Sequence, residues 1–255
     1  MSGIVQVVWI KKSFRLADHV CFAQAADKGP VLPLYILEPD YWALPDTSYR
    51  HYQFMRGCAA EFADELQKIE ATLAVCMGSA LEVLQLLQSE FSQFELWSHQ
   101  ETGNAWSYER DQAVRSWCKE NHTPFHEPLQ FGVWRGSKTD RDHWAKRWDE
   151  LMAEPIASLT AEVSFVEHSF ESSLPEPEDL GLVNDGIVNL QTPGRTAGVA
   201  VLNSFLYERG EQYRTDMSSP VTGESGCSRL SPHLTYGTLS MREIYQAAEQ
   251  RRAEV

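Results

Sequence analysis

The chain has 255 residues, 43% hydrophobic and 23% charged, which is typical of a globular protein long enough to bury a core. No apolar run approaches the ~20 residues that span a bilayer, and the first lysines follow the first apolar stretch, which excludes a secretory signal and favours a cytoplasmic location. The net charge of −14 argues against general DNA binding, since phosphate contacts need Lys and Arg.

Cysteine spacing excludes a disulfide framework and a zinc site of the CxxC kind. The five cysteines are odd in number and widely separated, so we predict reduced, mostly buried thiols and no metal site. His122 and His126 are four residues apart, but Pro124 breaks a helix between them, so this pair is interpreted as surface or strand edge.

Apolar, β-branched segments alternate with helical patterns over the first half of the chain. This order predicts an α/β fold, a doubly wound five-stranded parallel sheet of Rossmann-like type over residues 1–130. Ligands of such sheets usually lie outside the carboxyl ends of the strands. The predicted strands are residues 4–10, 31–37, 72–78, 94–99 and, more weakly, 124–128; the predicted helices are 48–69, 81–88 and 108–120.

The first strand-to-helix turn reads WIKKSFR and has no glycine, which excludes a dinucleotide-binding fingerprint there. Neither a P-loop nor a GxSxG nucleophile elbow occurs in the chain. Lys11, Lys12 and Arg15 of this turn either face an anion or form a solvated basic loop, and the residues alone leave both open.

Residues 131–194 combine an amphipathic helix (141–152) with an interdomain connector. Residues 160–194 hold seven acidic residues and no Lys or Arg, with Pro and Gly punctuation typical of irregular chain. The one basic cluster is interpreted as a solvated helix face, so we expect at most weak, salt-sensitive DNA binding. Its members are Arg135, Lys138, Arg141, Lys146 and Arg147.

Residues 195–255 return to helical periodicity, as the beginning of an incomplete all-helical domain. A helix is predicted over 197–214, and two more begin near Ser231, an expected N-cap followed by Pro232, and at Ser240, which forms a capping box with Glu243. The glycine-led turn before Ser231 carries Ser228 and Arg229 and offers donors for a diphosphate. Two ordinary capped helices with an exposed arginine remain the alternative.

The run GCSRLSPHLTYGTLS (226–240), with Tyr213 and Pro220 upstream, resembles the start of the helical FAD domain of photolyases and cryptochromes. VVWIKKSFRLADHVCFAQA (7–25) is similar to that family's opening strand, turn and helix, and VLPLYILEPDYW (31–42) to its second strand. The resemblance covers roughly the first 40 and the last 60 residues.

The resemblance implies FAD contacts at six residues of the helical part. Three departures weaken the match: Cys227 stands where threonine is common, Met217 where an arginine often follows the tyrosine, and Ser13 where the opening turn is usually acidic. The implied FAD contacts are Tyr213, Cys227, Ser228, Arg229, Leu230 and Ser231.

The resemblance also implies a light-driven DNA photolyase, a lyase in which reduced FAD passes an electron to a pyrimidine dimer in damaged DNA. The alternatives are a cryptochrome photoreceptor without repair and a nucleotide-binding α/β module with no flavin role. An antenna pigment (a pterin or a second flavin) is expected near Glu101 and Asn104, if the loop 99–108 is more than a strand-to-helix connection. The apolar faces of the helices after residue 195 need cover, so we expect them to be mobile, or to pack on the α/β domain or on a second copy of the chain.

Overall fold

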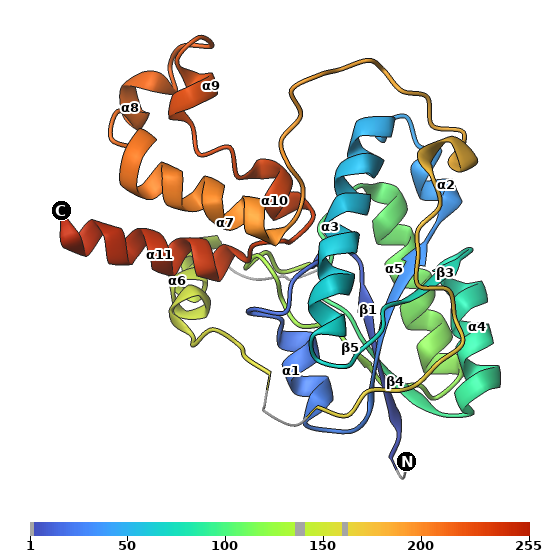
Figure 1. Cartoon of the computed structure of the whole chain (residues 1–255). Coiled ribbons are helices and arrows are strands. Elements are labelled where there is room, and N and C mark those ends of the chain that lie inside the picture. Colours follow the sequence, from blue (N-terminus) through green and yellow to red (C-terminus); the bar gives the residue numbers. More distant parts are fainter. Residues whose placement is uncertain (1–2, 136–140, 160–162) are drawn as a thin grey trace.

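The fold is known from a computed structural model that describes residues 3–135, 141–159 and 163–255 (Figure 1). A five-stranded parallel sheet has the order β3-β2-β1-β4-β5, so the chain winds outward from β1 first to one side and then to the other. This confirms the predicted doubly wound sheet. The strands are shorter than predicted at several ends: β1 (Val5–Ile10), β2 (Val31–Leu37), β3 (Ala74–Met77), β4 (Phe94–Trp97) and β5 (Phe125–His126).

Helices cover both faces of the sheet. Alternate residues of a strand point to opposite faces, so Val8 and Ile10 meet α1 and α3, whereas Val7 and Trp9 meet α4 and α5. Burial on both faces explains why every residue of β2 is buried and why its sequence is continuously apolar. These helices are α1 (Val20–Ala26), α3 (Tyr49–Gln67), α4 (Ala80–Phe91) and α5 (Ala105–Glu120), and a short α2 (Pro39–Trp42) follows β2.

The segment between α6 and α7 is irregular, as predicted, but it is bound along the sheet. Its apolar side chains, such as Phe165 and Leu174, pack on the α1/α3 core, and Val31 pairs with Phe165 as an isolated bridge. Figure 1 shows this chain turning beside α2 and then arching over the upper end of α3 to α7. Before this segment come the 3-10 turn η1 (Arg141–His143) and α6 (Trp144–Ala153), and within it lies the 3-10 turn η2 (Pro177–Leu180).

Residues 195–255 are helical, but the predicted helix over 197–214 is broken. α7 (Arg195–Ser204) passes into a π-helical turn η3 (Phe205–Arg209) and ends at Gly210. The capping box at Ser240 is confirmed: the Ser240 hydroxyl accepts from the Glu243 N–H, and the Glu243 carboxylate accepts from the Ser240 N–H. The remaining helices are α8 (Tyr213–Asp216), α9 (Gly223–Gly226), α10 (Ser231–Thr235) and α11 (Met241–Glu254).

The helical segment packs on the α/β part through the turn after β1. Phe14 N–H donates to Tyr236 O at 3.2 Å, and the Arg15 guanidinium donates to Gly237 O at 2.8 Å. Leu202, Leu230 and Leu239 form a small separate apolar cluster within the segment. Of the alternatives expected for these helices, packing on the α/β part is therefore the one observed. Within the described ranges, no helix has the length and apolar character needed to cross a membrane.

Candidate functional site

A buried group of ion pairs closes the carboxyl ends of β1, β2 and β4. At its centre the Asp111 carboxylate of α5 has no exposed surface and contacts Lys11 at 3.0 Å, Arg110 at 2.9 Å and Arg135 at 2.5 Å. Glu101 binds Lys12 at 2.8 Å, and Arg110 at 2.6 Å. We call the following eight residues the carboxyl-end ion network: Lys11, Lys12, Glu38, Glu101, Arg110, Asp111, Glu127 and Arg135.

The network favours the ionised form of two of its buried carboxylates, Glu101 and Asp111. Burial alone disfavours the charged carboxylate, but Arg110 and Lys12 outweigh it and lower the pKa of Glu101 to about 2. Likewise burial raises the pKa of Asp111, and Lys11 and Arg110 overcome that effect and lower it. The positive charges of the first turn are therefore matched inside the protein.

The interpretation of the basic first turn as a solvated loop was wrong. Lys11 and Lys12 are paired with Asp111 and Glu101, and Arg15 is buried with its guanidinium on main-chain oxygens of Gly237 and Asp18. Lys11 and Lys12 also line a cavity beside this turn, so an anion facing them stays a prediction. Apart from Asp18, the partners of the three cations lie 89 to 222 positions away along the chain, which is why the local sequence did not reveal them.

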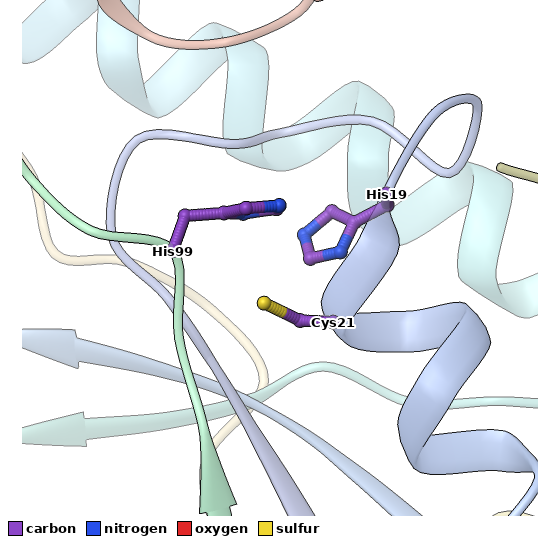
Figure 2. Close-up of side chains that lie close together, drawn as sticks. All are labelled: His19, Cys21 and His99. Atoms are coloured by element: carbon purple, nitrogen blue, oxygen red, sulfur yellow. The ribbon is translucent and has the colours of Figure 1, made fainter. Parts of the chain in front are cut away.

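Among the described residues, one group of three potential metal ligands is buried close together: His19, Cys21 and His99 (Figure 2). Phe22 N–H donates to His19 Nδ1 at the start of α1, so the neutral ring carries its proton on Nε2 and donates it to Ser13 Oγ at 3.0 Å. Burial, with His99 and Arg15 nearby, holds the pKa of His19 well below its usual value. Burial also raises the pKa of the Cys21 thiol.

A cation fits this cluster poorly. It would have to displace the helix-capping bond of His19 and the proton of Cys21. It would also add positive charge beside Arg15 and Lys11, and burial together with these two charges already lowers the pKa of His99. We therefore assign the cluster to packing and to capping of α1.

A cavity of about 910 Å³ lies where the helical segment meets α3 and the connector. We call it the motif cavity, because its lining includes Cys227, Ser228, Arg229 and Ser231 of the run singled out in the sequence. Aromatic side chains of Tyr41, Trp42, Phe54 and Tyr236 form part of its wall. The full lining comes from residues within 41–54, 189–193 and 227–236.

Four of the six residues predicted to contact FAD thus share one cavity, and two do not. The Tyr213 ring lies edge-on to Phe205 at 5.5 Å, outside this lining, and Leu230 packs against Leu202 and Leu239. Ser231 is not the N-cap of α10, because Leu230 already has helical dihedral angles and takes that place, leaving Ser231 without a capping hydrogen bond.

Arg209 holds the cavity loop in place, which the sequence did not indicate. Its guanidinium donates to the main-chain oxygens of Cys227 and Ser228, the latter at 2.7 Å, and to Val201 O at 3.1 Å in α7. Arg209 lies in the π-helical turn, and such turns give no sequence signal in a short helix.

A second cavity of about 260 Å³ lies between the turns that follow β1 and β4. These neighbouring strands mark the topological switch point of the sheet, the usual ligand position in this architecture. Of the two antenna candidates, Glu101 lines this cavity, whereas Asn104 caps α5 by accepting from Ser107 N–H and also donates to Asp46 at 2.9 Å.

Comparison with known proteins identifies the family. A family model described as DNA photolyase matches residues 6–135, half of the chain. The chain belongs to the DNA photolyase family. Two curated relatives are a deoxyribodipyrimidine photo-lyase of Halobacterium salinarum, 24% identical over 98% of this chain and 56% of the relative, and Cryptochrome-1 of Erithacus rubecula, 24% identical over 95% and 43%.

Solved structures share the fold of the chain. An archaeal photolyase of Sulfolobus tokodaii, described as holding two FAD molecules, superposes with a TM-score of 0.71 at 23% identity, covering 96% of this chain and 55% of that one. The chain spans about half the length of the curated relatives it matches. The family model ends at residue 135, so it covers the part of the cavity lining within residues 41–54 but not the motif residues Cys227, Ser228, Arg229 and Ser231.

The basic cluster noted in the sequence is partly neutralised in this member of the DNA photolyase family. Arg135 binds Asp111 and Glu127 in the carboxyl-end ion network, and Lys146 lies 3.8 Å from Glu150 on the same helix. Arg147 lies over the Trp134 ring. Lys138 falls outside the described residues. Weak, salt-sensitive DNA binding stays a prediction.

Proposed function

We propose that this chain is the N-terminal part of an FAD-dependent, light-driven DNA photolyase, with the cofactor's diphosphate held in the motif cavity. The observation that carries the proposal is the convergence of Cys227, Ser228 and Arg229 on one cavity. Its volume of about 910 Å³ falls within the range of cofactor sites, which is ~300–1,000 Å³.

The groups in the cavity suit a diphosphate. Ser228 and Ser231 offer hydroxyl donors, and Arg229 offers a planar guanidinium, the side chain best matched to phosphate oxygens. Cys227 offers only a weak thiol donor where the family commonly has threonine. When bound, FAD supplies light absorption and electron transfer, while these residues bind and orient it.

Replacing Arg229 with Ala should weaken FAD retention by about 10- to 100-fold in the full polypeptide that carries these residues. A charge-assisted hydrogen bond contributes ~1.5–3 kcal/mol, which corresponds to that range. Flavin occupancy after purification and titration with FAD measure the effect. Arg252→Ala is the control, because Arg252 is paired with Glu249 on α11 and does not line the cavity. Equal affinities of the two variants for FAD would show that Arg229 does not contact the cofactor.

Two measurements on that polypeptide distinguish repair, signalling and a flavin-free role. They are its flavin content and its light-dependent removal of dimers from damaged DNA. A photolyase binds flavin and removes dimers from damaged DNA under light, a cryptochrome binds flavin without repair, and a plain nucleotide-binding module is colourless. The cryptochrome alternative is kept because curated relatives of both kinds match over nearly the whole chain. The self-association expected of the chain stays a prediction for sedimentation analysis.

Residues 1–255 alone should show no light-dependent loss of dimers. They span about half of each curated relative, and a cofactor held at one end lacks the positioning that its chemistry needs. The measurement is illumination of dimer-containing DNA with the isolated chain, FAD and a reductant, against a sample without protein. Dimer loss above that control would place the whole catalytic site within these residues.

For an antenna pigment, we propose the cavity at the switch point. Glu101 and His99 line it, and His99 Nδ1 is buried with no hydrogen-bond partner in the structure. Its volume of about 260 Å³ is below the usual cofactor range, which favours a pterin ring over a second flavin. Fluorescence of the pigment released from purified protein distinguishes the two.

A further inference from the structure

The lining of the motif cavity includes a second arginine, which is contributed by the α/β part of the chain. Arg50 is the second residue of α3 and lines the same cavity as Arg229. Its side chain is 41% exposed and lies 3.9 Å from the Asp185 carboxylate of the connector. An exposed ion pair at that distance contributes little, so the guanidinium is easily given to another anion.

A second arginine on α3 makes a different contact with the connector. Arg56 forms two hydrogen bonds to the two carboxylate oxygens of Glu176, one of them at 2.7 Å. This bidentate pair fastens the connector to α3, and Arg56 does not line the cavity. The pair of Arg50 and Asp185 is the looser of the two, and it is the one that borders the cavity.

The connector also offers the cavity a polar atom without a partner. The Gln191 amide nitrogen donates to Arg229 O at 3.1 Å, whereas its Oε1 is buried and has no hydrogen-bond donor. Buried acceptors are nearly always paired, so this one points to a ligand hydroxyl or amino group. A nucleotide carries both kinds of donor next to its phosphates. The cavity is therefore built from three segments, of which the sequence motif is one.

We propose that Arg50 is a second anchor for the diphosphate, and that it exchanges Asp185 for the phosphate oxygens when the nucleotide binds. This inference rests on the proposed FAD site. It predicts that Asp185 competes with the ligand for Arg50, and hence that the two partners of one ion pair have opposite effects on affinity. A merely structural ion pair would give both substitutions the same effect.

The test is titration of the full polypeptide with FAD, and separately with ADP, in wild type, Arg50→Gln, Asp185→Asn and Arg56→Gln. We expect Arg50→Gln to weaken both ligands by about tenfold and to flatten the salt dependence, since one phosphate contact is lost. Asp185→Asn should tighten them by about two- to fivefold, since Arg50 is released from a weak pair. Arg56→Gln should leave both affinities unchanged.

The controls separate binding from folding. Arg50→Gln and Asp185→Asn break the same ion pair, so any cost to folding is matched between them, and thermal unfolding of all four proteins checks this. Weaker binding in both variants, or an Arg50→Gln affinity within twofold of wild type, overturns the inference while leaving the FAD site intact. If wild type binds neither FAD nor ADP, the proposed function itself fails.

Discussion

Replacing Asp111 with Asn should lower the free energy of unfolding by about 3–5 kcal/mol at pH 7, because it removes one partner from a buried group of charges. Asp111 has no exposed surface and contacts Lys11, Arg110 and Arg135. Asn keeps the size of the side chain, so the loss reports charge rather than a cavity. Urea unfolding at neutral pH measures it.

The control for this substitution is Glu150→Gln. Glu150 lies 3.8 Å from Lys146 on one helix, and both side chains are largely exposed, so removing this charge should change the free energy by less than about 0.5 kcal/mol. Equal effects of the two substitutions would mean that the buried network adds no more to stability than a surface pair.

The carboxyl-end ion network should also make the protein sensitive to acid. The folded-state pKa values of Glu101 and Asp111 are lowered, that of Glu101 to about 2, whereas unfolded carboxylates titrate near pH ~4. The stabilisation is therefore complete above pH ~4 and is lost as the pH falls from there towards 2. Urea unfolding at intervals over that range should show the decline, and Asp111→Asn should show a smaller one.

The sheet was predictable because its signal is local. Each strand is a short apolar run, and each helix between strands carries its own apolar stripe, so β1 to β5 and α3 to α5 follow from windows of a few residues. The ends of β3 and β5 were predicted too long, since pairing with the neighbouring strand, and not composition, decides where a strand stops.

The site was predictable only in part, because it depends on distant contacts. The motif placed Ser228 and Arg229 on a cavity wall, but nothing near them in sequence indicates Arg209, Gln191 or Arg50 as neighbours. The same holds for the first turn. Its lysines look solvated in the sequence, whereas in the structure they form ion pairs with Glu101 and Asp111. Ion pairs between residues ~100 positions apart leave no periodic pattern in the sequence from which they could be predicted.

The glycine of the motif run should prove essential for packing between the two parts of the chain. Gly237 has φ +64°, and a Cβ there would meet Lys12 O at 2.2 Å, a main-chain atom that cannot move aside cheaply. Its own carbonyl accepts from Arg15, and Tyr236 O accepts from Phe14 N–H, so the turn is held against β1 from both sides. Gly237→Ala should therefore lower the free energy of unfolding by about 3 kcal/mol or more.

Gly186→Ala isolates the steric part of that effect. Gly186 has a similar φ of +71° but nothing within 4 Å of its added Cβ, so it should lose only the ~1–2 kcal/mol of left-handed strain. Urea unfolding of both variants gives the difference, and protease cleavage within residues 195–255 of Gly237→Ala shows whether the helical segment has separated. Equal losses in the two variants would mean that the close approach to Lys12 does not hold the segment. A larger loss of unfolding free energy in Gly237→Ala, with faster cleavage, would show that Gly237 holds the helical segment against the α/β part. Gly237 does not line the motif cavity, so this effect is separate from cofactor binding.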